Sequence, residues 1–287
     1  MTSFRVTVAY DGSDFVGWQR QAAGTSIQGL LEDAARALDD RDVTVIGAGR
    51  TDAGVHALGQ VAAFTLERTI SADSLVRAMN ARLPETVRIL EASEVPAGFH
   101  PQFDARAKTY RYRMWNADAM SPFERRYAWH LPGRLDVDAM RAAAGLLEGE
   151  HDFAAFQGTG SDVATTVRRI LASRIADCGL RIDCGLPIAS SPIASSPIAS
   201  SPIAPSPIAP SAVRNPQSAL LEYEITGSGF LRHMVRAIAG SLVEVGRGRQ
   251  APDWIARVMA SRDRCAAGQT APASGLFLVG VDYGACD

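Results

Sequence analysis

The sequence predicts an α+β fold of two ferredoxin-like (RRM-like) βαββαβ halves, with mainly antiparallel sheets side by side and a cleft between them. Two observations predict it. Strand-like and helix-like stretches follow the order β-α-β-β-α-β over residues 1–104, and the same order returns over 105–287. Hydrophobic residues make up 47% of the 287 residues, which is enough for two ordinary cores. The likeness of the halves rests on element order, because no sequence repeat relates them.

In the first half, apolar and polar residues alternate from Phe4 to Tyr10, which is typical of a half-buried strand. Ser26 is placed to cap a helix, because apolar residues follow it at helical spacing. The remaining elements expected here are a strand over 43–48, a strand over 58–66, a helix capped by Ser71 and stopped by Pro84, and a strand over 87–95.

In the second half, residues 108–115 predict a strand with Tyr110, Tyr112 and Met114 on one face and Arg111 and Arg113 on the other. The remaining elements expected here are a helix over 136–147, strands over 166–177 and 219–226, helices over 230–245 and 252–260, and a buried strand over 276–281.

One segment departs from this pattern. Residues 186–210 are five near-copies of a pentamer, within a stretch over 186–212 that is rich in Pro, Ser, Ala and Ile. A proline every fifth residue blocks both helix and central strand, so we expect a disordered excursion from the tip of a hairpin. The alternative is a ligand for a proline-recognising domain, which would need closer PxxP-type spacing.

Composition excludes several classes of protein. The net charge of −2 means that any nucleic-acid surface must be a local patch. The four cysteines form no CxxC pair and lie at no zinc spacing from histidine, so we expect free thiols and no metal. The chain begins directly with a strand pattern and has no apolar run of about 18 residues, so we expect a cytoplasmic protein without a membrane span. No P-loop or GxGxxG is present, which indicates no cofactor.

The stretch over 47–56, Gly-Ala-Gly-Arg-Thr-Asp-Ala-Gly-Val-His, is the first candidate for chemistry. It carries one acid, Asp52, with a guanidinium and an imidazole, and apolar strand-like residues bracket it. Glycine-rich loops on rigid scaffolds are common places for catalytic groups. The alternative is a hairpin loop in which Asp52 only bonds its own turn, and the local sequence leaves both open.

Two further segments are candidates for RNA contact. The strand that begins at Lys108 interleaves aromatic and basic residues, as RNA modules do, although strand propensity alone also accounts for the pattern. In the predicted helix over 230–245, Arg232 and Arg236 are four residues apart and share a face. Two like charges there need an anion opposite, and either Asp52 or an RNA phosphate would supply it.

Taken together, these segments resemble the bacterial tRNA pseudouridine synthase A family. The resemblance covers the chain except for 186–212 and rests on segments in one fixed order. They are Tyr10-Asp11-Gly12-Ser13, Gly17-Trp18-Gln19-Arg20-Gln21, Ile27-Gln28-Gly29, the nine residues from Gly49 to Ala57, Phe99-His100-Pro101, Lys108 to Tyr112, Asp152 to Phe156, Phe230 to Arg236 and Ala273 to Leu278.

The resemblance implies a cofactor-free isomerase that converts uridine to pseudouridine at positions 38 to 40 of the tRNA anticodon stem-loop. It implies Asp52 as the nucleophile on a flipped-out uridine, with Arg236 as its cationic partner. It further implies that Arg50 fills the space the base vacates, that Tyr110 stacks on the uracil, and that Leu276 forms part of the pocket wall. The expected partners are tRNA and a second copy of the chain in a homodimer, with no metal.

Two other functions stay open on the residues alone. A tRNA-binding protein or RNA chaperone would share the RNA surface without needing Asp52. An Asp-dependent glycosidase would share the chemistry at C1′, but it usually needs a second acid, and the matching motifs show none. The insert puts local packing and RNA access in question and leaves the catalytic motifs intact.

Overall fold

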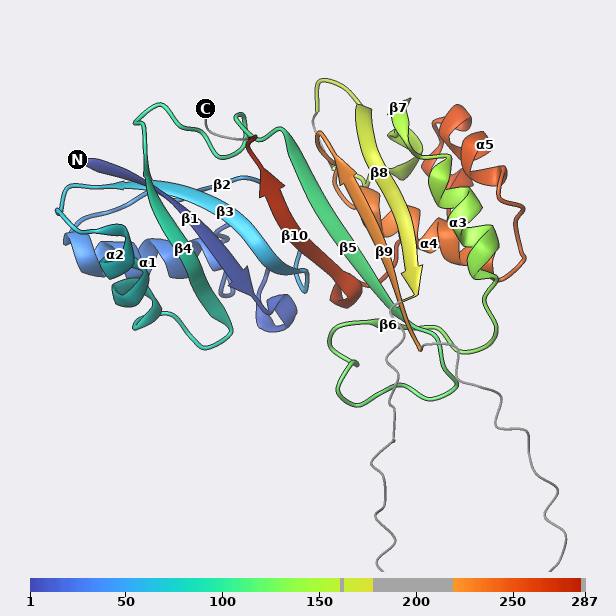
Figure 1. Cartoon of the computed structure of the whole chain (residues 1–287), viewed down its shortest axis with the longest axis horizontal. Coiled ribbons are helices and arrows are strands. Elements are labelled where there is room, and N and C mark those ends of the chain that lie inside the picture. Colours follow the sequence, from blue (N-terminus) through green and yellow to red (C-terminus); the bar gives the residue numbers. More distant parts are fainter. Residues whose placement is uncertain (161–162, 178–218, 285–287) are drawn as a thin grey trace, which may run out of the picture.

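The computed structural model describes residues 1–160, 163–177 and 219–284, so the insert over 186–212 lies outside the described residues. These residues form an open sheet of ten strands, mostly antiparallel, with five α-helices against it (Figure 1). The α+β class is therefore confirmed. The strands run in the order β4-β1-β3-β10-β5-β9-β8-β7, with β2 beside β3 and β6 beside β5.

The elements of the first stretch follow the predicted order. Their bounds are β1 (Thr2–Tyr10), α1 (Ile27–Asp39), β2 (Ile46–Gly47), β3 (His56–Leu66), α2 (Ala72–Asn80) and β4 (Val87–Val95). The Ser26 hydroxyl accepts a hydrogen bond from the Gly29 amide at 3.2 Å, and the Ser71 hydroxyl accepts one from the Ser74 amide at 3.4 Å. Both predicted caps are confirmed, because each hydroxyl satisfies an amide of the first helical turn.

The second stretch adds two short strands, β6 and β7, that the sequence did not predict. Its bounds are β5 (Ala107–Trp115), β6 (Trp129–His130), α3 (Val137–Gly145), β7 (Gly149–Asp152), β8 (Val167–Asp177), β9 (Leu220–Gly227), α4 (Met234–Gly246), α5 (Trp254–Ser261) and β10 (Leu276–Asp282). In Figure 1, α1 and α2 accompany one half of the sheet and α3, α4 and α5 the other.

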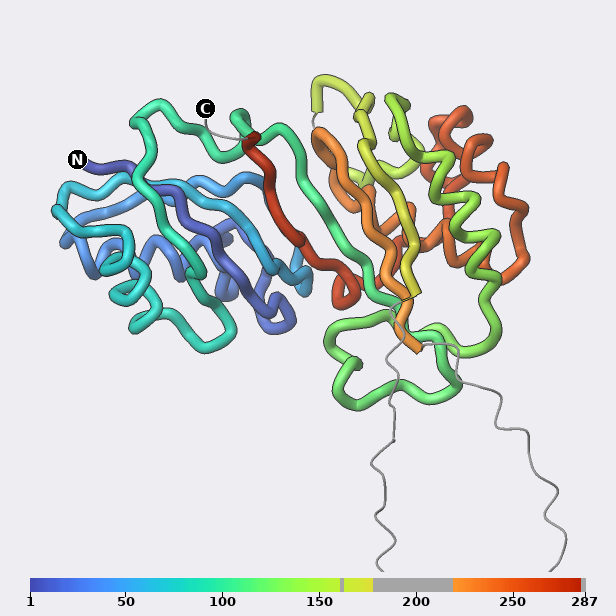
Figure 2. The backbone as a smooth tube through the Cα atoms, in the orientation of Figure 1, coloured from blue at the N-terminus to red at the C-terminus, as the bar shows by residue number. Residues whose placement is uncertain are grey.

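The last strand joins the two stretches. β10 runs parallel to β3, where Phe277 lies opposite His56, and antiparallel to β5, where Leu276 lies opposite Tyr112. Figure 2 shows this red segment between the blue segment of β3 and the green segment of β5. The strands therefore form one continuous sheet, and the first residues of β10 lie next to the start of β3.

The basic and aromatic faces of β5 have different surroundings. Tyr110, Tyr112 and Met114 share one face of the strand, as predicted, and all three are buried. On the other face, Arg111 lies 2.9 Å from Glu224 of β9, and Arg113 lies 3.3 Å from Glu222. The arginines of this strand are therefore paired with acids of the neighbouring strand, which favours the ordinary-strand interpretation for that face.

Two predicted elements are shorter than expected. The strand over 43–48 is reduced to Ile46–Gly47, because side chains of α1 bond the backbone at Val45 in place of a strand partner. Gln28 Nε2 donates to the Val45 carbonyl at 3.0 Å, and Glu32 Oε1 accepts from the Val45 amide at 3.4 Å. The helix predicted from residue 230 begins at Met234, because His233 adopts a left-handed conformation with φ of 60°.

Among the described residues, no helix has both the length and the apolar character that crossing a membrane requires.

Candidate active site

The loop that carries Asp52 is fixed from beneath by β1 and by the segment that precedes α1. The Thr51 carbonyl accepts from the Trp18 amide at 3.0 Å, and the Thr51 hydroxyl bonds the Tyr10 hydroxyl at 2.8 Å. Gly54 closes the turn with φ of 77°, a conformation that side chains disfavour. Thr51 is buried, whereas the Asp52 side chain is 31% exposed. The loop therefore presents a carboxylate from a rigid base.

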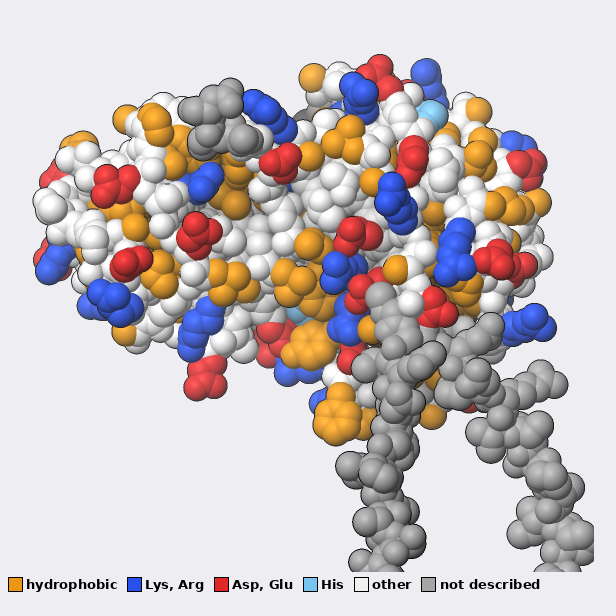
Figure 3. Space-filling model, in the orientation of Figure 1, with side chains coloured by type: hydrophobic (Ala, Val, Ile, Leu, Met, Phe, Trp, Pro, Cys, Tyr) orange, Lys and Arg blue, Asp and Glu red, His pale blue; other side chains and the backbone are white. Residues whose placement is uncertain are grey.

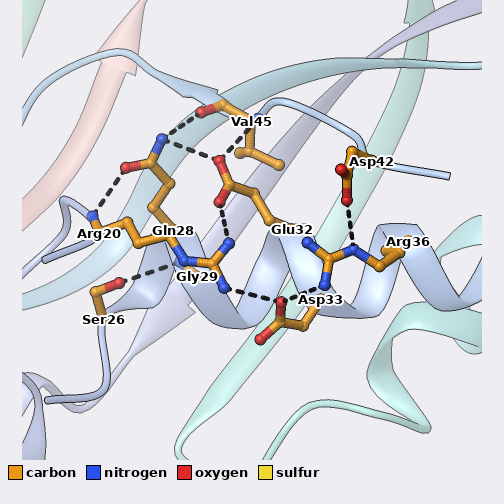
Figure 4. A network of polar contacts seen from close by, with 9 residues as sticks. All are labelled: Arg20, Ser26, Gln28, Gly29, Glu32, Asp33, Arg36, Asp42 and Val45. Atoms are coloured by element: carbon orange, nitrogen blue, oxygen red, sulfur yellow. Dashed lines mark hydrogen bonds and ion pairs between the residues drawn. The ribbon is translucent and has the colours of Figure 1, made fainter. Parts of the chain in front are cut away.

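Trp18 supports this loop, and a polar network holds its segment against α1. Figure 4 shows Arg20 between acids of α1: its Nη1 donates to Glu32 at 2.9 Å and its Nη2 to Asp33 at 3.0 Å. The Arg20 amide donates to Gln28 Oε1 at 3.0 Å. The charge of Arg20 is therefore balanced within the protein.

Two basic side chains meet one oxygen of Asp52. Arg236 Nη1 donates to Oδ2 at 3.2 Å, and His233 Nε2 lies 3.3 Å from the same oxygen. Arg236 is held in place because its Nε donates to the Ala271 carbonyl at 2.8 Å. The expected pairing of Arg236 with an anion is present, and Asp52 is that anion.

Arg232 does not share the face of Arg236, so that expectation is wrong. The helix begins after Arg232, and its guanidinium turns to the Thr159 carbonyl, at 3.0 Å, and to the Gly160 carbonyl, at 3.4 Å. The repulsion that a shared helical face would create is avoided by the left-handed residue between the two arginines.

Tyr110 and Leu276 lie on neighbouring strands, β5 and β10, and both are almost fully buried. The Tyr110 ring packs edge-on against Phe230, with centroids 5.0 Å apart. Burial raises the pKa of Tyr110, and the nearby Tyr10 and Asp52 raise it further. The phenol therefore keeps its proton at neutral pH.

All five residues predicted for the site line one cavity of about 1390 Å³. They are Arg50, Asp52, Tyr110, Arg236 and Leu276. Among the described residues that line it, Asp52 is the only carboxylate, whereas four lining residues are cationic: Arg50, Lys108, Arg232 and Arg236. On the face shown in Figure 3, acidic and basic side chains are interspersed. Because the chain as a whole has a net charge of −2, the positive charge of the cavity lining is a local feature.

Two residues that line the cavity, His233 and Lys108, were not among the site residues predicted from the sequence. His233 lies in the segment from Phe230 to Arg236 that carries the family resemblance, but its contact with Asp52 depends on a left-handed turn that no helical pattern indicates. Lys108, the only lysine of the chain, donates to the Ala48 carbonyl at 2.6 Å, and burial lowers its pKa. Together with Gln60, whose Nε2 donates to the Gly49 carbonyl at 2.9 Å, it fixes the backbone that precedes Arg50.

The imidazole of the predicted loop, His56, serves the structure instead. Its side chain is 1% exposed and its ring stacks on Phe277 with centroids 4.6 Å apart. Nδ1 accepts from the Gly12 amide at 3.1 Å, and Nε2 lies 3.2 Å from the Ser274 carbonyl. His56 therefore ties β3 to the segment that leads into β10.

The arrangement offers a carboxylate, paired with one guanidinium and facing a basic cavity with an apolar and aromatic wall. Among the residues that the structure describes, no group of three or more His, Cys, Asp or Glu is placed to hold a metal ion. Such a site suits a nucleophile or base that works on a polyanionic substrate.

Comparison with known proteins gives one consistent result. A family model described as tRNA pseudouridine synthase matches residues 6–104 and 143–284. The tRNA pseudouridine synthase A of Solibacter usitatus is 42% identical over 286 residues, covering 99% of this chain and 100% of the relative. That of Geotalea uraniireducens is 38% identical, with 99% and 100% covered, and that of Myxococcus xanthus is 39% identical, with 99% and 92% covered. The chain therefore belongs to the tRNA pseudouridine synthase A family, isomerases that act on uridines of tRNA.

Proposed function

We propose that this protein isomerises uridine to pseudouridine at positions 38 to 40 of the tRNA anticodon stem-loop, without a cofactor and with Asp52 as the nucleophile. One observation carries the proposal. Asp52 is the only carboxylate among the described residues of the cavity, and Arg236 lies 3.2 Å from it. A nearby cation favours the ionised form that a nucleophile needs.

The overall isomerisation balances in atoms and electrons, with the proton from C5 released to water and the proton at N1 taken from water. The bond between N1 of the uracil and C1′ breaks, C5 forms the new bond to C1′, C5 loses its proton, and N1 gains one. No electrons enter or leave, so the reaction needs no redox partner. The cavity has to retain the detached base while it turns, and an aromatic wall beside a carboxylate suits that task.

We assign three further roles. Arg50 is exposed at the cavity, two residues from Asp52, and is assigned to the space that the flipped uridine leaves in the RNA. Tyr110 is assigned to stack on the uracil, and Leu276 to bound the pocket on the β10 side. The phenol of Tyr110 stays protonated, so it acts through contact and hydrogen bonding rather than as an anionic base.

The cationic residues of the cavity would contact tRNA phosphates, so affinity should fall with salt. We assign the protein to the cytoplasm, where tRNA is processed, and expect a homodimer with tRNA crossing both subunits. We also divide the chain into two ferredoxin-like units, 1–104 and 105–287. Supporting this division, the strands lie in the orders β4-β1-β3-β2 and β10-β5-β9-β8, which correspond position by position.

The glycosidase alternative is disfavoured by the cavity. Glycosidases of the usual kind place two carboxylates on either side of the scissile bond. The described part of the cavity offers Asp52 alone. Water attack on C1′ would also release the base, whereas an isomerase has to keep it.

The test uses unmodified anticodon stem-loop transcripts that carry a single uridine at position 38, 39 or 40. Wild type should convert each uridine to pseudouridine, detected by nucleoside mass spectrometry after reaction with carbodiimide, which marks pseudouridine. Asp52→Asn, which keeps the shape of the side chain, should convert none. Conversion only at positions elsewhere in full tRNA would overturn the assignment of the target.

A further inference from the structure

His233 is the second basic group at Asp52, and its position is specific. Its Nε2 lies 3.3 Å from Asp52 Oδ2, the oxygen that Arg236 also meets. His233 immediately precedes α4 and lines the cavity, and its imidazole is 28% exposed, so it is partly shielded from water.

His233 has a backbone conformation that residues other than glycine rarely adopt, and this conformation places its ring beside Asp52. His233 adopts φ of 60°, one of three non-glycine residues with positive φ in the described part of the chain. Residues in such conformations persist where the surrounding structure imposes them, and they concentrate at functional sites. The conformation ends the preceding segment and starts α4 at the next residue, which aims the imidazole at Asp52.

The neighbouring loop leaves room for this ring. A Cβ at Gly158 would lie 2.6 Å from His233 Nδ1 and 2.9 Å from its Cγ, so no larger residue fits without moving the imidazole. The Gly158 amide donates to the Arg232 carbonyl at 2.8 Å, which ties the two segments together. The position of the His233 ring beside Asp52 therefore depends both on its own segment and on the loop that contains Gly158.

The charges that face His233 come from every side. Asp52 on the loop before β3 favours the protonated ring, whereas Arg236 on α4, Arg232 before it and Arg264 after α5 disfavour it. Burial adds the largest effect, and together these groups lower the pKa of His233 below its usual value. At neutral pH the imidazole is therefore uncharged, and among the residues that the structure describes Arg236 is then the one cationic side chain paired with Asp52.

We propose that His233 is a titratable residue that positions Asp52, and that the His233 imidazole has to be uncharged for turnover. A protonated ring would put a second cation on the same carboxylate oxygen. Two cations there would stabilise the resting carboxylate and weaken it as a nucleophile, whereas a neutral ring only holds it in place. The inference rests on the proposed role of Asp52 and adds a pH dependence to it.

The test is the pH dependence of single-turnover pseudouridine formation, with enzyme in excess over tRNA, between about pH 7.5 and pH 5. The wild-type rate should fall about tenfold for each pH unit below the pKa of His233. His233→Asn is the informative variant, because asparagine tolerates the left-handed conformation and does not titrate. His151→Gln, at a half-buried histidine of β7 that lies outside the cavity of Asp52, is the matched control.

His233→Asn should give a nearly flat profile over this range, and His151→Gln the wild-type profile. Circular dichroism and tRNA binding at each pH establish that the variants remain folded and bound. An acidic limb of unchanged position in His233→Asn would overturn the proposal, as would a rate reduced by the same factor at every pH. Full activity of Asp52→Asn would instead refute the function proposed for Asp52, so the two failures are distinguishable.

Discussion

Gly47 is where the support of the Asp52 loop can be tested by adding one methyl group. A Cβ there would lie 2.5 Å from Cε2 and Cζ2 of Trp18 and 2.7 Å from its Nε1. Trp18 is 3% exposed and its amide holds the Thr51 carbonyl, so the indole cannot move outward without disturbing the loop. Overpacking of this kind costs about 1–3 kcal/mol. For a chain of this size, about 2–4 °C of Tm per kcal/mol gives a fall of roughly 2–12 °C in Gly47→Ala.

The assay is thermal unfolding followed by circular dichroism, with tritium release from labelled tRNA measured in parallel. Gly145→Ala is the matched control, because a Cβ at Gly145, the last residue of α3, would meet nothing within 4 Å. The control should keep the wild-type Tm or exceed it slightly. Equal Tm values for Gly47→Ala and Gly145→Ala would refute the argument that Trp18 is tightly packed beneath the loop.

Three other predictions concern the site. Arg236→Met removes a charge-assisted hydrogen bond of about 1.5–3 kcal/mol, so kcat should fall about 10- to 150-fold; a rate within about threefold of wild type would contradict this. Lys108→Met leaves the Ala48 carbonyl unpaired and should cost about 1–3 kcal/mol in urea unfolding, so an unchanged midpoint would refute it. Gly158→Ala should slow turnover by displacing His233, and combining it with His233→Asn should add little; additive effects would show that the two act separately.

Much of the fold follows from local patterns in the sequence. The strand from Phe4 to Tyr10 shows its period directly, and Ser26 and Ser71 cap their helices as their positions predict. What local patterns could not indicate are arrangements set by distant parts of the chain. At Val45, hydrogen bonds from side chains of α1 replace the pairing of a strand. β10 lies between β3 and β5, two strands far from it in the sequence, so its place could not be read from local patterns.

The candidate site divides in the same way. Asp52, Arg236 and Tyr110 could be named because they stand in motifs, and the structure brings them to one cavity. Their roles stay predictions. The contact of His233 with Asp52 could not be foreseen, because it depends on one backbone dihedral angle and on the space beside Gly158. The helix rule placed Arg232 beside Arg236, and that same dihedral angle separates them.

Asp52 is the residue proposed to perform the isomerisation, and tritium release from tRNA labelled at C5 of uridine tests that role most directly. Each turnover removes the C5 hydrogen, so released tritium counts the reaction itself. Wild type should release tritium, whereas Asp52→Asn should bind the same tRNA with similar affinity and release none above background. Release by Asp52→Asn at a rate near that of wild type would contradict the account, because the cavity's described residues offer no second carboxylate to replace it.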